Sequence, residues 1–152
     1  MGDLLEDTEL KVSNTNVSGL LACRTSLDPV DVVHRLTEMA IENAYQFRFA
    51  IKFIPLQRCV TSEIPEIVAA VKELSSKITP SDTFRVTVRR RHSELDTTEV
   101  VEAAASVISR DVNLDNPDKT VWIEIVGVWT GVSVLDREKD ILSIMTMRDD
   151  EY

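Results

Sequence analysis

The residues with the clearest chemical potential lie in one short, strongly basic segment. Residues 84–92 hold the densest positive charge in the chain, namely Arg85, Arg89, Arg90, Arg91 and His92. Guanidinium groups bind phosphates and stack on bases, and an imidazole can do the same. The segment therefore predicts a surface that binds nucleic acid. The alternative is a solvated strand face whose charges are balanced by nearby acids.

Two further cations extend this predicted surface. Lys52 belongs to a predicted strand, and Arg58 follows in the next loop. We expect Arg89, Arg90, Arg91 and His92 to contact phosphates, with Lys52 and Arg58 continuing the path and Arg85 in a secondary role. Trp122 and Trp129 are either stacking platforms or a buried aromatic pair.

No motif for catalysis or metal binding stands out. The sequence has no GxSxG elbow, P-loop, GxGxxG after a strand or HExxH. The acids Asp96, Glu99 and Glu102 are explained by a helix start, where capping and the helix dipole favour negative charge. Cys23 and Cys59 lack the spacing of a zinc site or a disulfide framework, so we expect reduced, buried thiols. We therefore expect neither an enzyme nor a cofactor.

The overall charge argues against nucleic acid at first, but its distribution weakens the objection. The net charge is −9, while residues 1–11 and 136–152 contribute −3 each. The body of the chain is thus only mildly acidic and can carry a local basic face. Apolar runs are too short for a membrane span, and the N-terminus has no secretory pattern. We expect a cytoplasmic protein without a membrane partner.

The basic residues need strands and helices to position them, and the hydrophobic periodicity predicts both. Strands are expected at about 19–23, 47–54, 84–91, 121–126 and 129–135, and helices at about 29–44, 62–78 and 96–108. Gly127-Val128 is typical of a two-residue hairpin. In the segment 84–91, Phe84, Val86 and Val88 alternate with the arginines, which indicates a half-solvated strand.

These elements predict an α/β fold in which one mixed sheet of five strands packs with three principal helices. With 152 residues the chain is long enough for one compact domain. We expect this domain over residues 16–135, between an acidic polar tail at 1–15 and a charged tail at 136–152. A short helix is expected within 136–145.

Several segments of the chain resemble the THUMP family of tRNA-handling proteins. The main one is residues 112–125, with Asn116-Pro117 and a Val121 to Ile125 strand, followed by Gly131-Val132-Ser133-Val134. Upstream similarities, over a span of about 16–135, are Arg24-Thr25, Pro29, Val32-Val33-His34, Ile54-Pro55-Leu56, Cys59, Arg89, Arg91 and Thr98-Glu99-Val100. The chain is most similar to the stand-alone THUMP adaptors of tRNA acetylation.

The resemblance implies a function as well as a fold. It implies binding of tRNA at the acceptor stem and CCA end, and delivery of that tRNA to a separate modification enzyme. In the adaptor subfamily this enzyme is an acetyltransferase that modifies a cytidine. These residues include no appended catalytic domain, which fits an adaptor. The alternative, motivated by the net charge of −9, is a protein-interaction subunit of an RNA-processing complex that does not contact RNA.

Overall fold

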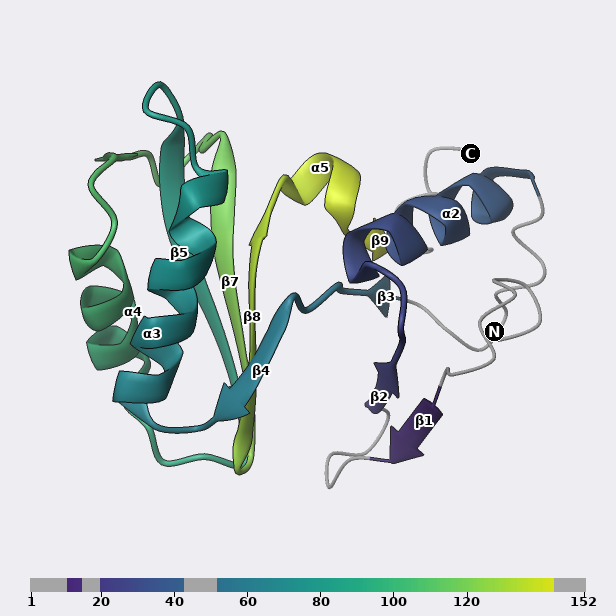
Figure 1. The fold of residues 1–152 in the computed structure, drawn as a ribbon, viewed down its shortest axis with the longest axis horizontal. Helices are drawn as coiled ribbons and strands as arrows, with labels where there is room; N and C mark the ends of the chain where they lie inside the picture. The colour runs from purple at the N-terminus through teal and green to yellow at the C-terminus, as the bar shows by residue number, and fades with distance from the viewer. Residues whose placement is uncertain (1–10, 15–19, 43–51, 144–152) are drawn as a thin grey trace. The chain divides into compact units, whose positions relative to one another are not determined.

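The computed structural model describes residues 11–14, 20–42 and 52–143 (Figure 1). The chain divides into two compact units. The larger unit contains residues 56–136 and the described part of 14–22, and the smaller contains the described parts of 1–13, 23–55 and 137–152. These units do not follow the predicted limits at residues 16 and 135, which stay predictions.

The larger unit is built on a mixed sheet of five strands in the order β4-β8-β7-β5-β6. The strands are β4 (Arg58–Thr61), β5 (Thr83–Arg91), β6 (Asp111–Val112), β7 (Lys119–Val126) and β8 (Trp129–Leu135). Strand β5 runs parallel to β6 and β7, whereas β8 runs antiparallel to β7 and β4. This confirms the predicted α/β class, with β5 next to a short edge strand.

Two helices cover one face of this sheet, as Figure 1 shows. They are α3 (Ile64–Leu74), which continues into the 3-10 turn η2 (Ser75–Lys77), and α4 (Thr97–Ser106). Their apolar residues, such as Ile67, Val71 and Ala104, pack with Phe84 and Ile123 of the sheet in one buried core. The helical spacing of apolar residues had predicted both contact faces, because residues three and four apart share one side of a helix.

Local signals fix where the elements of this unit begin and turn. The Asp96 carboxylate accepts hydrogen bonds from the backbone N–H groups of Thr98 (2.9 Å) and Glu99 (3.3 Å), which confirms the predicted helix start. Gly127 has φ +58° at the first central position of the β7–β8 turn. A left-handed conformation there matches the twist of the two strands, so the predicted hairpin is confirmed.

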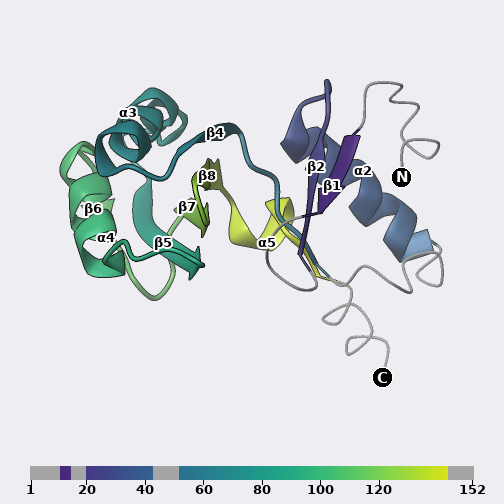
Figure 2. The same ribbon diagram turned by 90° about the horizontal axis from the view of Figure 1, so that it is seen from below.

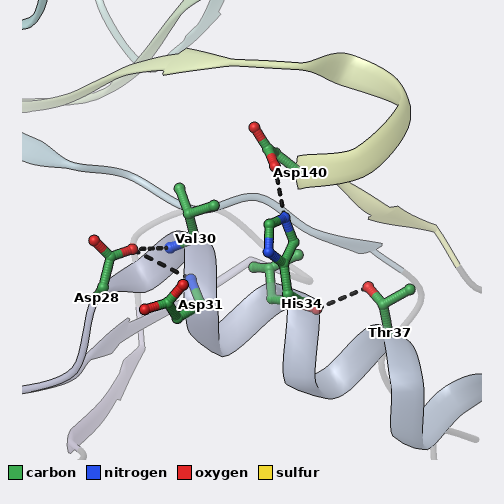
Figure 3. Close-up of polar contacts among 7 residues, drawn as sticks. Asp28, Val30, Asp31, His34, Thr37 and Asp140 are labelled. Carbon is green, nitrogen blue, oxygen red and sulfur yellow. Dashed lines mark hydrogen bonds and ion pairs between the residues drawn. The ribbon is translucent and has the colours of Figure 1, made fainter. Parts of the chain in front are cut away.

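The smaller unit has its own core around α2 (Pro29–Glu42). Leu36 of this helix packs with Leu142 of β9 (Leu142–Ser143), which pairs antiparallel with β3 (Lys52–Phe53). Figure 3 shows the Asp28 carboxylate capping the helix and His34 reaching Asp140 of α5 (Arg137–Asp140), with 2.6 Å between Nε2 and Oδ1. This contact connects α2 to α5 within the unit.

Figure 2 turns the molecule to show the remaining pair of strands, β1 (Lys11–Asn14) and β2 (Leu21–Arg24). These two form a separate two-stranded sheet. The described residues of the predicted strands at 19–23 and 47–54 therefore do not join the main sheet. Of the second, only Lys52–Phe53 is a strand among the described residues, and residues 47–51 lie outside them.

The main sheet is completed instead by β4 and β6, which the sequence did not predict. Strand β4 has only four residues and β6 only two, so neither is long enough to display a period of two. The prediction of buried cysteines is also wrong, because Cys23 and Cys59 are both exposed, outside any disulfide.

No helix within the described residues is long and apolar enough to cross a membrane.

Candidate nucleic-acid interface

Strand β5 sorts its arginines onto two faces of the sheet. Phe84, Val86 and Val88 pack against the core beneath α3 and α4. Successive side chains of a strand point to opposite faces, so Arg85, Arg89 and Arg91 lie on the face away from the helices. The predicted alternation is therefore correct. It is not a simple half-solvated strand, however, because Thr87 on the second face is buried.

A buried polar cluster on β7 holds one of these arginines. The Arg91 guanidinium donates to Oε1 of Glu124, and the indole Nε1 of Trp122 donates to Oε2 of the same carboxylate at 2.8 Å. The Glu124 side chain is only 7% exposed, while Arg91 is 37% exposed. A buried carboxylate needs such partners. Arg91 therefore neutralises Glu124 in the fold, which limits what it offers to a phosphate.

Among the four arginines of β5, Arg89 has the greatest freedom to bind a ligand. Its guanidinium carbon lies 5.5 Å from the centre of the Trp122 ring, and the residue is exposed. Among the described residues it has no hydrogen bond or ion pair, so all of its N–H donors are available. The indole ring holds the guanidinium plane by a cation–π contact. Such a group can bind a phosphate or cover an unstacked base.

Trp122 itself is not a stacking platform. Its side chain is fully buried, whereas Trp129, opposite Val126 in the hairpin, is partly buried. The open question about the tryptophans is thus settled for Trp122. It supports Arg89 from beneath.

The other predicted residues of the segment have structural contacts of their own. Arg85 donates from NH1 to the carbonyl of Leu114 at 2.8 Å, and Arg90 donates to the carbonyl of Leu95 at 2.7 Å. Both contacts leave further guanidinium N–H groups unused. His92 follows β5 with φ +54° and is exposed. This left-handed backbone ends the strand, because few non-glycine residues adopt it within a strand.

Arg58 is not brought together with this group, and Lys52 belongs to the other compact unit. Arg58 is on β4, the opposite edge strand of the sheet, where it donates to Oε1 of Glu73 on α3 at 3.0 Å from NH2 and 3.2 Å from Nε. Its side chain is therefore on the helix-covered face. Lys52 lies in β3 of the smaller unit. Five of the seven predicted residues thus come from one strand and its end, and the roles of all seven stay predictions.

A shallow cavity of about 280 Å³ lies along β5. It is lined by side chains of β5 and of the first turns of α4, namely Arg85, Val86, Thr87, Val88, Arg89, Thr97, Thr98 and Val101. The Thr87 hydroxyl and the Arg85 Nε are buried without a hydrogen-bond partner among the described residues. Groups of this kind normally have partners. The cavity is therefore a place where a ligand with hydrogen-bonding groups could be held.

Two small residues of β8, Gly131 and Ser133, shape the second face of the sheet. A side chain at Gly131 would come within 2.3 Å of Leu56 Cδ1. The Ser133 hydroxyl accepts from the backbone N–H of Gln57 at 2.8 Å, and the Gln57 side chain accepts from the N–H of Val134 at 3.0 Å. The small-residue strand thus lets the segment before β4 lie against β8. These residues belong to the segments that resemble the THUMP family, but only their contacts with Leu56 and Gln57 show what they do in the fold.

The two described residues with a shifted pKa, Asp82 and Cys23, lie outside the candidate interface. No three His, Cys, Asp or Glu side chains among them are arranged to hold a metal ion. The backbone N–H of Thr79, 2.9 Å from an Asp82 carboxylate oxygen, lowers the pKa of that carboxyl, which directly precedes β5 and is outside the cavity lining. Partial desolvation of the sulfur raises the pKa of the Cys23 thiol, although the residue as a whole is exposed. Neither group belongs to the candidate interface.

The fold and the site define a class, a mixed α/β domain that presents an arginine-bearing strand next to a helix start. Residues 61–135 match the family described as THUMP domain. This part of the chain is therefore a THUMP domain. The match begins at the last residue of β4 and ends with β8, so it contains the whole β5 segment.

Some known proteins are distantly similar to this chain in sequence and in fold. The chain is 21% identical over 146 residues to a THUMP domain-containing protein 1 homolog of Drosophila melanogaster, with 88% of this chain and 45% of that protein covered. It therefore spans less than half of that relative's length.

Two solved structures are also similar. The crystal structure of PH1313 from Pyrococcus horikoshii matches with a TM-score of 0.63 and 17% identity, over 94% of this chain and 47% of that one. The solution structure of the THUMP domain of THUMP domain-containing protein 1 matches with a TM-score of 0.38 and 23% identity, over 46% of this chain and 85% of that one. The match to PH1313 shows a shared fold.

Proposed function

We propose that this chain binds tRNA through its THUMP domain and acts as an adaptor without catalytic activity of its own. The observation that carries the proposal is the exposed, unpaired Arg89 held on Trp122 within a THUMP domain. Phosphates supply most of the affinity between proteins and RNA, and guanidinium groups are suited to them. Arg85 on the same face of β5 and His92 at its end would add phosphate contacts, and Arg90 would add one from the opposite face, where it also donates to Leu95.

The finer parts of the proposal come from the family resemblance. The tRNA would be held at its acceptor stem and CCA end, whose unstacked bases a guanidinium plane can cover. It would then be presented to a separate modification enzyme, for which a cytidine acetyltransferase is our proposal. This activity would take place in the cytoplasm. Arg58 would contribute at most from the other edge of the sheet, and Lys52 would add a cation from the smaller unit.

The test is binding of the purified chain to a labelled tRNA, with and without its CCA end, across a series of salt concentrations. Arg89→Ala should weaken binding and reduce the slope of log affinity against log salt by about one, the value for one lost phosphate contact. Arg58→Ala is the matched control, since Arg58 is on the helix-covered face and already paired with Glu73. Its affinity and slope should stay close to those of the unmodified chain.

Two outcomes would contradict the proposal. Equal losses in Arg89→Ala and Arg58→Ala would mean that binding follows general charge and not the β5 surface. The absence of any binding at low salt would favour the second candidate, a protein-interaction subunit that does not contact RNA. The net charge of −9 is the observation in favour of that candidate.

Removal of the CCA end tests the finer part separately. A tRNA that lacks these nucleotides should bind more weakly if the acceptor end is captured. Unchanged affinity would leave a tRNA-binding domain that recognises another part of the molecule. The enzyme would be tested by adding a cytidine acetyltransferase with acetyl-CoA and ATP, with and without this chain, and measuring acetylated cytidine.

A further inference from the structure

Within the part of the chain that the structure describes, one edge of β5 is open along most of its length. Strand β6 pairs with β5 only at Thr83 and Phe84, whereas β7 pairs with it from Phe84 to Arg91. Strand β6 therefore covers only the first two residues of β5. Open strand edges are templates for pairing with another chain.

Two hydrogen bonds show which backbone groups face the open side. The Phe84 carbonyl accepts from the N–H of Asn113, just after β6, and the Arg91 carbonyl accepts from the N–H of Gly127, just after β7. In a strand the backbone groups of successive residues point to alternate sides. The even-numbered residues Val86, Val88 and Arg90 therefore direct their N–H and C=O groups to the side that β6 leaves uncovered.

The surroundings of this edge have a definite chemistry. The cavity described above lies along it, and its lining combines apolar Val86, Val88 and Val101 with the cations Arg85 and Arg89. No acid belongs to the lining, although Asp96 and Glu99 are close by at the start of α4. At the end where β6 stops, Val112 and Leu114 are exposed by 57% and 62%. The edge thus offers hydrogen bonds, apolar sockets and positive charge together.

We propose that this edge binds an extended acidic segment of a partner protein, which adds a strand beside β5. Such a segment would satisfy both donors and acceptors of Val86 and Val88, and its apolar side chains would enter the cavity. Its acids would meet Arg85 and Arg89. An RNA backbone fits less well, because its phosphates only accept hydrogen bonds and its 2′-hydroxyl groups do not alternate with them in the donor and acceptor pattern of a strand. The proposal does not depend on tRNA binding.

Amide hydrogen exchange followed by NMR on the full chain tests the edge directly. The probe is a peptide of about eight residues that alternates glutamate with valine, a normal length for a strand. In the free chain the amides of Val86 and Val88 should exchange faster than those of Thr87 and Arg89, which face β7. The peptide should shift the Val86 and Val88 signals and slow their exchange about tenfold, as expected for a new backbone hydrogen bond.

Matched variants separate the backbone from the side chain. Val88→Pro removes the N–H that faces the open side and should weaken peptide binding about fivefold or more, as expected for one lost hydrogen bond. Val88→Ala shortens the side chain but retains the N–H, so it should weaken binding less. Equal losses in the two variants would refute backbone pairing. Thermal melting of both variants confirms that each is folded.

Other results would overturn the proposal outright. One is exchange at Val86 and Val88 as slow as at Thr87 in the free chain. A second is no shift at these amides with the glutamate peptide at about 1 mM. A third is equal binding of a peptide with lysine in place of glutamate. If tRNA but not the peptide slows exchange at these two amides, the edge serves RNA instead. If Arg89→Ala loses tRNA binding, this result bears on the proposed tRNA function. It does not test whether the β5 edge binds a peptide.

Discussion

Replacement of Arg91 by alanine should destabilise the fold, although Arg91 belongs to the predicted RNA surface. The change leaves the Glu124 carboxylate, whose side chain is 7% exposed, with the Trp122 indole as its remaining side-chain donor. Removing one partner of a fully buried pair costs about 3–5 kcal/mol. Arg91 is 37% exposed, and the indole bond survives, so we expect about 1–3 kcal/mol.

Thermal unfolding followed by circular dichroism measures this loss. For a chain of this size the cost corresponds to a fall in Tm of roughly 2–12 °C. Arg89→Ala is the control, because an exposed cation–π contact contributes only about 0.5–1 kcal/mol. Adding Glu124→Gln to Arg91→Ala should recover part of the stability, since the neutral amide still accepts from Trp122. An unchanged Tm in Arg91→Ala, or no recovery in the double variant, would refute the reasoning.

Three other predictions concern the fold. Gly131→Ala should lower the free energy of unfolding by about 1–3 kcal/mol in a denaturant titration, because a methyl group there collides with the Leu56 side chain. Asp96→Ala should cost about 1 kcal/mol in the same titration, through loss of the α4 cap. The lowered pKa of Asp82 means that its contribution to stability is present above the ordinary aspartate pKa and is lost as the pH falls through the folded value. When the pH is lowered from neutral to strongly acidic, the free energy of unfolding of Asp82→Asn should therefore fall less than that of the unmodified chain.

Much of the main sheet could be predicted from the sequence, because β5, β7 and β8 are long enough to show their patterns. Strands β7 and β8 are buried on both faces and read as continuous β-rich runs, joined by a turn that begins with Gly127. The edge strands could not be found in this way. Their four and two residues become strands only through pairing with β8 and β5, and pairing depends on residues far away in the sequence.

The position of the candidate site could be predicted from the sequence, but the different roles of its residues could not. Counting cations located the β5 segment, since four of its residues are arginines. Counting could not show that Arg58 is on the other edge and on the other face, paired with Glu73. It also gave no sign that Trp122 would lie beneath Arg89. Both facts follow from strand order and register, which bring residues from different strands together.

The register between β5 and β7 decides which arginine is available to a ligand. Thr87 is paired with Trp122 and Arg89 with Glu124, yet the carboxylate receives its hydrogen bond from Arg91, two residues further along the same face. Arg89 is thereby left above the indole ring with its donors unused. A shift of one residue in this register would move Glu124 and Trp122 relative to every arginine, because neighbouring side chains would then change faces. The RNA binding that we propose for β5 would therefore be a property of the paired strands and not of the arginine run itself.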